Sequence, residues 1–175
     1  MSETKCADGA DLTPLTPLTP LTPLEPLEVV WIDEVADGER WYTKQRRLRW
    51  EVLRRPLGMR EGAELNPHEA ELRHCVAVVA GEVVGTVSWH PEPGAASGKL
   101  VQMAVEPAWE RRGVGARLVR ALEARAASEG AALVHMHARA LAVGFYAKLG
   151  YRVEGEPFEQ IGISHVVMCR RLDDG

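Results

Sequence analysis

Hydrophobic residues follow two different spacings along the chain after residue 28. Short segments in which they alternate with polar residues or run together are typical of β-strands, whereas apolar residues three and four positions apart predict amphipathic helices. The expected strands are 28–33, 74–80, 83–90, 99–105, 131–137, 151–158 and 165–172, and the expected helices are Glu39 to Arg54, the segment after Gly115, and about Leu141 to Leu149. This alternation predicts an α/β fold with a mixed sheet.

Glycine and proline residues mark the ends of these elements. Pro56 and Gly58 end the first helix, Gly150 ends the third, and Gly81-Glu82 joins two strands as a β-hairpin. One face of each long helix is expected to be buried. The buried positions would be Trp41, Gln45, Leu48 and Val52 in the first helix, and Val114, Leu118, Ala121, Leu122 and Arg125 in the second.

Length and cysteine usage limit the class of protein. A chain of 175 residues is long enough for one domain with a hydrophobic core and too short for two large ones. The sequence has no run of about 18 apolar residues and no basic segment followed by an apolar one at the N-terminus. Cys6, Cys75 and Cys169 lack metal-ligand spacing, which suits free thiols in a reducing compartment, and the last two are expected in the core. We expect a cytoplasmic protein without a membrane partner.

The first 28 residues differ in composition from the rest. From Leu12 the segment "LTPLTPLTPLTPLEPLE" repeats Leu-x-Pro every three residues. Proline at every third position is incompatible with a helix and interrupts a sheet ladder, whereas it suits polyproline II. We therefore expect residues 1–28 to be a disordered or extended tail and residues 29–175 to be the domain. The alternative for the tail is a docking segment for a proline-binding module.

The net charge of −4 belongs to this tail. Five acidic residues and one lysine fall within residues 1–28, so of the chain's 25 acidic and 21 basic residues, 20 of each remain in 29–175. A neutral domain argues against nucleic acid as a partner, because that binding depends on neutralising phosphates. Positive charge is instead local, since the segment Glu110 to Arg125 contains five arginines and two glutamates.

The segment "QMAVEPAWERRGVGA", residues 102–116, predicts an anion site. Its strand-like part leads through a proline turn and an arginine pair to Gly113-Val114-Gly115, which opens the second helix. Glycines let backbone N–H groups approach an anion closely, and the helix N-terminus adds a partial positive charge. Alone, a Gly-x-Gly before a helix is a weak signal, since glycine turns before helices are common.

Two segments together resemble the GNAT family of acyl-CoA N-acyltransferases, over residues 29–175. The first is "MAVEPAWERRGVGA", which is similar to the family's apolar strand, R/Q-x-x-G-x-G/A and helix. The second is "LAVGFYAKLGY", in which Ala142, Tyr146, Gly150 and Tyr151 match A-x-x-x-Y-x-x-x-G-[FY]. The ending "GEPFEQIGISHVVM" is similar to a branch of small, mostly uncharacterised bacterial members.

This resemblance implies a fold and a donor. The fold is a single-domain GNAT-like α/β fold, with a mixed, mostly antiparallel twisted sheet, flanking helices and a splay between two central strands. The donor is acetyl-CoA or a related acyl-CoA. Its pyrophosphate would be held by the backbone of Arg111, Arg112, Gly113, Val114, Gly115 and Ala116, and its pantetheine arm and thioester carbonyl by a strand bulge at Met103, Ala104 and Val105.

Two positions depart from the family pattern. Glu110 stands where Gln or Arg is usual, and a carboxylate there would repel a pyrophosphate unless it is paired or turned outward, as we expect. Arg139 stands where many members have Asn, and it would either reach the cofactor or pair with a carboxylate. Neither change removes the backbone groups of the anion site.

The implied reaction is direct attack of an amine on the thioester. By the resemblance Tyr146 contacts the donor and protonates the leaving thiolate. With reference pKa values of about 10 for Tyr and about 8.5 for a thiol, that transfer is uphill by roughly 2 kcal/mol, so Tyr146 either acts in a site that closes the gap or hydrogen-bonds the sulfur. Glu159 and His165 are the first candidates for the general base, with His137 third. Tyr146 also has a purely structural interpretation as a buried aromatic.

The sequence leaves several questions open. His135 and His137 share a strand face, but without neighbouring ligands they predict no metal. The five tryptophans have no common spacing and are expected in the core or at an interface, with Trp109 placed to flank the cofactor. The expected function is acetyl transfer from acetyl-CoA to an amine of a small molecule or peptide. The alternatives are a non-catalytic acyl-CoA-binding or sensory module, and an interaction scaffold; a homodimer is compatible with the sequence and is not determined by it.

Overall fold

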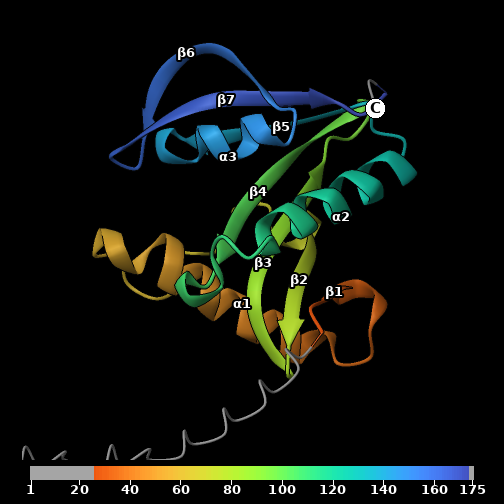
Figure 1. Ribbon diagram of the computed structural model, residues 1–175, viewed down its shortest axis with the longest axis vertical. Coiled ribbons are helices and arrows are strands. Elements are labelled where there is room, and N and C mark those ends of the chain that lie inside the picture. Colours follow the sequence, from red (N-terminus) through yellow and green to blue (C-terminus); the bar gives the residue numbers. More distant parts are fainter. Residues whose placement is uncertain (1–25, 174–175) are drawn as a thin grey trace, which may run out of the picture.

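The computed structural model describes residues 26–173, which form one seven-stranded sheet with helices on both faces (Figure 1). The strands are β1 (Glu28–Trp31), β2 (Arg73–Val79), β3 (Glu82–Pro91), β4 (Ser97–Val105), β5 (Leu133–Arg139), β6 (Arg152–Gln160) and β7 (Ile163–Arg171). Their order across the sheet is β1-β2-β3-β4-β5-β7-β6. Only β4 and β5 pair in parallel, which confirms the predicted mixed, mostly antiparallel sheet.

The longer helices α1 (Gly38–Leu53) and α2 (Val114–Ser128) cover opposite faces of the sheet, and α3 (Val143–Lys148) follows β5. On β3, Thr86 Oγ1 donates to Gln45 Oε1 of α1, whereas a Cβ at the neighbouring Gly85 would lie 2.9 Å from Leu118 of α2. Neighbouring residues of a strand point to opposite faces, so the two helices lie on opposite sides. Figure 1 shows α2 in front of the sheet. No helix in residues 26–173 is long and apolar enough to span a bilayer.

Strands β4 and β5 begin together and then separate. They pair only from Ser97 to Lys99 on β4, opposite Leu133 to His135 on β5. Beyond these residues β4 pairs only with β3 and β5 only with β7 (Figure 1). This is the predicted splay, and it leaves the facing backbone edges of two central strands unpaired with each other.

A β-bulge interrupts β4 at Gln102. Thr86 pairs with Ala104 and Ser88 with Val101, so Gln102 and Met103 lie opposite a single residue of β3. Gln102 has a φ of 54°, in the left-handed region that non-glycine residues seldom adopt. The bulge therefore begins one residue before the expected stretch of Met103 to Val105.

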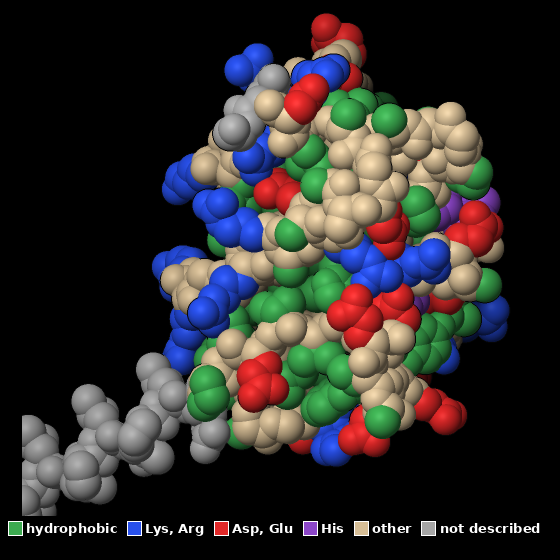
Figure 2. Space-filling model, turned by 90° about the vertical axis from the view of Figure 1, so that its right-hand side faces the viewer, with side chains coloured by type: hydrophobic (Ala, Val, Ile, Leu, Met, Phe, Trp, Pro, Cys, Tyr) green, Lys and Arg blue, Asp and Glu red, His purple; other side chains and the backbone are tan. Residues whose placement is uncertain are grey.

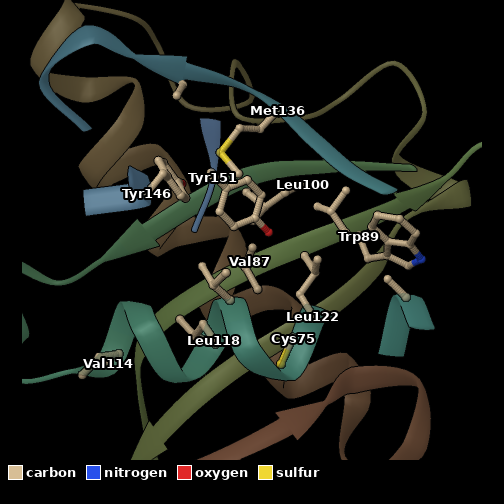
Figure 3. Packing of buried hydrophobic residues seen from close by; sticks show 14 of the residues in the cluster. Cys75, Val87, Trp89, Leu100, Val114, Leu118, Leu122, Met136, Tyr146 and Tyr151 are labelled. Carbon is tan, nitrogen blue, oxygen red and sulfur yellow. The ribbon is translucent and has the colours of Figure 1, made fainter. Parts of the chain in front are cut away.

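The hydrophobic core lies mainly between the sheet and α2 (Figure 3). Trp89 is almost completely buried in it, and its indole N–H donates to Glu129 Oε2 at 3.0 Å. The other four tryptophans are only partly buried. Cys75 is buried as expected, but Cys169, which pairs with Arg152 of the edge strand β6, is only partly buried.

Both long helices bury a face close to the predicted one, with two corrections. In α1 the buried residues are Gln45, Leu48 and the unexpected Arg49, whereas Trp41 and Val52 are partly exposed. In α2, Val114, Leu118 and Leu122 are buried, whereas Ala121 and Arg125 are only partly buried. The Arg125 side chain forms ion pairs with Asp33, Glu34 and Glu129, at 2.9, 2.5 and 2.6 Å.

The prediction of a Leu-x-Pro tail falls almost wholly outside the described residues. Of its last residues, Leu27 packs against the hydrophobic core and its carbonyl accepts a hydrogen bond from Arg117. Glu28 begins β1, where it pairs with Val78.

Candidate functional site

The N-terminus of α2 has the geometry of an anion site. Gly113 precedes the helix with a φ of 81°, and no side chain caps the first turn there. The first N–H groups of a helix have no acceptor within it, so those of Val114, Gly115 and Ala116 carry the positive end of the helix dipole. Arg111 also has a positive φ, 58°, which turns the preceding backbone. This arrangement suits a pyrophosphate.

The charged side chains around this turn are exposed. Glu110 is exposed, as are Arg111 and Arg112, and the Arg112 guanidinium lies 5.1 Å from the centre of the Trp109 ring. Figure 2, which views the right-hand side of Figure 1, shows Lys and Arg side chains gathered along the edge on which α2 lies. The local positive charge is smaller than the sequence suggested, because Arg125 at the other end of α2 is neutralised by its acidic partners.

A cavity of about 310 Å³ opens where β4 and β5 separate. Its walls come from the end of α1, residues 65–67, β4, β5, α3 and the β6–β7 turn. Met103 lines it, and a Cβ at Gly115 would lie 3.1 Å from the Met103 Cε and 3.1 Å from the Phe145 Cζ. The anion site and the cavity are therefore adjacent, and position 115 has little room for a side chain.

Tyr146 reaches this cavity from α3. Its side chain is 5% exposed, and its ring packs edge to face against Phe145 and Tyr151, with ring centres 4.9 and 5.8 Å away (Figure 3). Burial raises the pKa of the Tyr146 hydroxyl well above its ordinary value, because the phenolate would lose its hydration. The hydroxyl therefore keeps its proton at neutral pH and can donate a hydrogen bond.

Two of the three candidate bases line the cavity. His165 is buried, and its Nδ1 donates to the Ile163 carbonyl at 2.8 Å, which leaves Nε2 as the acceptor of a neutral ring. His137 lines the cavity too, but its Nε2 accepts from Lys99 Nζ at 3.1 Å while Nδ1 donates to Gln160 Oε1. Glu159 is exposed on β6 and does not line the cavity.

The remaining predicted site residues differ in their relation to this cavity. Arg139, at the end of β5, lines it and donates to the Leu53 carbonyl at 2.9 Å instead of pairing with a carboxylate. Ala104 is buried and pairs with β3, as does Val105, and neither lines the cavity.

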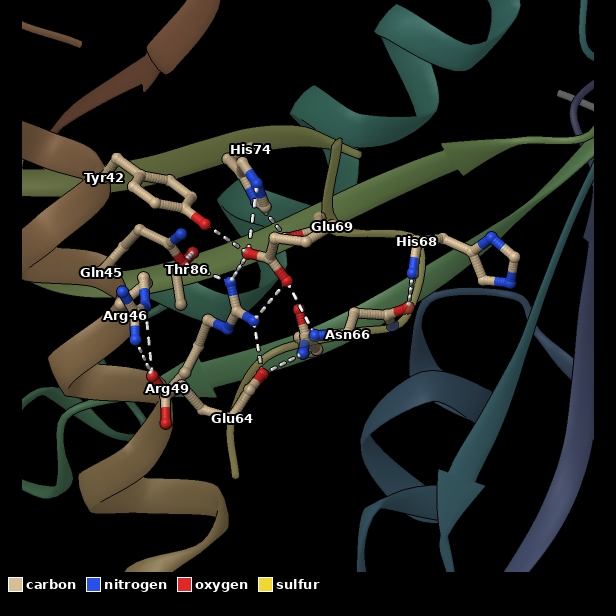
Figure 4. A network of polar contacts seen from close by, with 12 residues as sticks. Tyr42, Gln45, Arg46, Arg49, Glu64, Asn66, His68, Glu69, His74 and Thr86 are labelled. Atoms are coloured by element: carbon tan, nitrogen blue, oxygen red, sulfur yellow. Dashed lines mark hydrogen bonds and ion pairs between the residues drawn. The ribbon is translucent and has the colours of Figure 1, made fainter. Parts of the chain in front are cut away.

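Arg49 holds one wall of the cavity and was not predicted from the sequence (Figure 4). Its guanidinium is completely buried, donates to both carboxylate oxygens of Glu69 at 2.7 and 3.0 Å, and reaches the Glu64 carbonyl at 2.5 Å. The Gln102 side-chain amide donates to that same carbonyl, which ties the segment around Glu64 to the β4 bulge. A signal was present, since Arg49 follows Gln45 by four residues on the buried side of the helix.

One group of side chains in residues 26–173 has the spacing of a metal site. The ligand atoms of His68, Glu71 and His90 lie within 4.8 Å of one another, outside the cavity. Glu71 accepts hydrogen bonds from both rings, at 3.0 and 3.3 Å, which accounts for the grouping without an ion. His135 instead contacts Glu92. The absence of a metal from the reaction stays a prediction.

Comparison with known proteins identifies the family. The acetyltransferase (GNAT) domain matches residues 59–172, more than half of the chain. The uncharacterised N-acetyltransferase YjcF of Bacillus subtilis is 34% identical over 124 residues, which are 70% of this chain and 87% of that protein. The uncharacterised N-acetyltransferase YitI of the same organism is 28% identical over 131 residues, 71% of this chain and 88% of its own. Another relative from that organism is 36% identical, but the chain spans only about half, 52%, of its length.

Solved structures with low sequence identity share the fold. A Lactobacillus plantarum protein, provisionally assigned as an N-acetyltransferase, superposes with a TM-score of 0.73 at 20% identity, covering 83% of this chain and 98% of its own. An aminoglycoside 6'-N-acetyltransferase complexed with coenzyme A superposes with a TM-score of 0.66 at 18% identity, covering 83% and 97%.

The sheet with its splayed central strands, the bulge and the glycine turn before α2 define an acyl-CoA-dependent transferase fold. The chain belongs to the GNAT family of acetyltransferases, enzymes that transfer an acyl group from acyl-CoA.

Proposed function

We propose that this protein transfers an acetyl group from acetyl-CoA to the amine of a small molecule or peptide. The observation that carries the proposal is the contact between the two halves of the site. The anion site at the start of α2 adjoins the cavity between β4 and β5 through Met103 and Gly115. A pyrophosphate at the first and a thioester in the second fit one extended donor.

The donor is held mainly by backbone groups in this proposal. The N–H groups from Arg111 to Ala116 bind the pyrophosphate, and the unpaired edge of β4 beyond Lys99 binds the pantetheine amides and polarises the thioester carbonyl. Backbone donors explain why Met103 and Val105 need only be apolar. The exposed Glu110 does not block these groups.

The reaction is a single displacement. The nitrogen lone pair of the neutral amine attacks the thioester carbonyl carbon, the N–C bond forms and the C–S bond breaks, and the sulfur leaves with the electron pair. The amine loses one proton to a base and the thiolate gains one. The products are an N-acetyl amide and the free thiol of CoA.

His165 is the base that the geometry favours. Its Nδ1–H is fixed by the Ile163 carbonyl, so Nε2 can accept the amine proton directly or through water. Lys99 already occupies the equivalent atom of His137. Tyr146 acts as a hydrogen-bond donor to the leaving sulfur, because its raised pKa makes complete proton transfer to a thiolate unfavourable.

The test measures product formation with chemically defined donors and acceptors. The purified chain is incubated with acetyl-CoA, propionyl-CoA or palmitoyl-CoA and a panel of amines, and mass spectrometry quantifies free CoA and the acylated amine. Acceptor-dependent release that is fastest with acetyl-CoA is expected. Binding of acetyl-CoA by calorimetry without acceptor-dependent release supports the acyl-CoA-binding module instead. Lack of acetyl-CoA binding contradicts both.

A further inference from the structure

The cavity beside the splayed strands carries cationic side chains and no acidic ones. Arg54, Lys99 and Arg139 line it, together with His137 and His165. Within residues 26–173, no aspartate or glutamate belongs to the lining. Walls of one charge sign around a partly dehydrated space attract ligands of the opposite sign and repel those of the same sign.

Within residues 26–173, the hydrogen bonds of Arg54, Lys99 and Arg139 all go to uncharged groups. Arg54 Nε donates to the Ala63 carbonyl at 3.0 Å, Arg139 to the Leu53 carbonyl at 2.9 Å, and Lys99 to the His137 ring at 3.1 Å. Burial lowers the pKa of all three side chains. Their charges are therefore costly and are not neutralised by a carboxylate contact.

Arg54 and Arg139 converge on one atom. The Leu53 carbonyl at the end of α1 accepts from Arg139 at 2.9 Å and, more weakly, from Arg54 at 3.4 Å. The proximity of Arg139 also lowers the pKa of Arg54, after the larger effect of burial. A guanidinium has five N–H donors, so both retain donors for a further acceptor. Two neighbouring guanidiniums suit a carboxylate or a phosphate.

Glu64 acts electrostatically on Arg54 and Glu92 on Lys99, but both carboxylates are engaged elsewhere. Glu64 pairs with Arg46 at 2.7 Å and accepts from the Gly62 N–H. Glu92 accepts from Ser97 and contacts the His135 ring. Neither side chain lines the cavity, so neither is placed to bind a cationic acceptor there.

We propose that the acceptor is a small amine that also carries an acidic group, a carboxylate or a phosphate, which Arg54 and Arg139 bind inside the cavity. The inference rests on the proposed acetyl transfer and narrows its acceptor. Amino acids are the simplest members of this class, and polyamines lie outside it. The inference places Arg139 on the acceptor side of the site, whereas the sequence analysis left it either to reach the cofactor or to pair with a carboxylate.

The experiment compares acceptors that differ only in the acidic group. Phenylalanine is paired with phenethylamine, lysine with cadaverine, and phosphoethanolamine with ethanolamine, and spermidine is the polycation. Acetyl-CoA is saturating, and mass spectrometry measures kcat and KM for each. The acidic member of at least one pair is expected to have a kcat/KM at least tenfold above that of its partner, and the pairs distinguish carboxylate from phosphate. Spermidine is expected to be the poorest acceptor.

Arg54→Gln and Arg139→Gln test the residues. Each is expected to raise KM for the preferred acidic acceptor at least tenfold, with a smaller change in kcat, and to reduce its preference over the partner amine. The KM for acetyl-CoA should change less than twofold. Arg54→Lys, which keeps the charge, should restore part of the preference. Arg55→Gln is the matched control, because Arg55 is exposed and does not line the cavity.

The outcomes separate this inference from the proposed function. Turnover in which the neutral amines or spermidine are preferred overturns the inference and leaves acetyl transfer standing. If no amine turns over, calorimetry with CoA and the acidic amines decides. Binding of an acidic amine that Arg54→Gln abolishes supports the site at Arg54 and Arg139, and lack of such binding overturns the inference. An equal loss of acetyl-CoA affinity in both variants would assign the arginines to the donor and would also overturn it.

Discussion

Replacing Arg49 by methionine should destabilise the protein strongly. Methionine has a similar length and fills much of the space, but it donates no hydrogen bond. The change removes two charge-assisted hydrogen bonds to Glu69 and one to the Glu64 carbonyl. It also leaves the Glu69 carboxylate, 16% exposed, without its cationic partner.

The magnitude follows from the burial of the pair. Removing one partner of a buried ion pair costs about 3–5 kcal/mol, mostly because the other charge stays buried and uncompensated. For a chain of this length the loss corresponds to a fall in Tm of roughly 6–20 °C. Urea unfolding followed by circular dichroism measures the free energy directly. A loss below about 1 kcal/mol would refute the reasoning.

Two further variants identify the cause. Arg47→Met removes an arginine from the same helix, but Arg47 is 75% exposed and pairs with Glu51 at the surface, so a loss much smaller than that of Arg49→Met is expected. Adding Glu69→Gln to Arg49→Met should recover part of the lost stability, because it removes the unpaired charge. A double variant as unstable as the sum of the single ones would show that packing, not charge, dominates.

Three other changes test separate parts of the structure. Tyr146→Phe should lower kcat at least tenfold if the hydroxyl contacts the leaving sulfur, and an unchanged kcat measured by CoA release would leave Tyr146 a purely structural role. Gly113→Ala should cost about 1 kcal/mol in urea unfolding, because the φ of 81° at Gly113, and not steric hindrance, disfavours alanine. Gly98→Ala should cost more, because its Cβ would collide with the Trp89 ring. Equal losses in the two variants would contradict this explanation. Burial lowers the pKa of His74 to about 4, so as pH falls the unfolded chain takes up this proton before the folded one does. The free energy of unfolding should therefore decline from about pH 6.5 towards pH 4. Urea unfolding across this range should show a flatter decline for His74→Asn than for the unchanged protein.

Local patterns predicted most of the fold, because strands and helices here depend on apolar spacing that neighbouring residues share. The expected helix from Glu39 to Arg54 is Gly38–Leu53 in the structure, and the expected strand at 99–105 begins two residues earlier. The glycine turn before α2 could be predicted because glycine itself allows the conformation.

The parts that could not be predicted depend on distant residues. Burial of Arg49 is tolerated only because Glu69, twenty residues later, folds back onto it. The β4 bulge at Gln102 is tied by the Gln102 side-chain amide to the Glu64 carbonyl, 38 residues earlier. No local spacing reports such pairs. The convergence of Arg54 and Arg139 on one carbonyl likewise needs the three-dimensional structure.

Under the proposed function, the short pairing of β4 with β5 would give the donor a role in stability. Within the described residues, β4 and β5 share three paired positions, from Ser97 to Lys99, and beyond Lys99 their facing edges are not paired with each other. A ligand with amides along its length, such as the pantetheine arm of CoA, would act there as an extra strand and bridge β4 to β5. Donor binding would then link the two halves of the sheet, so the cooperativity of their unfolding, and not only catalysis, would depend on the concentration of acetyl-CoA.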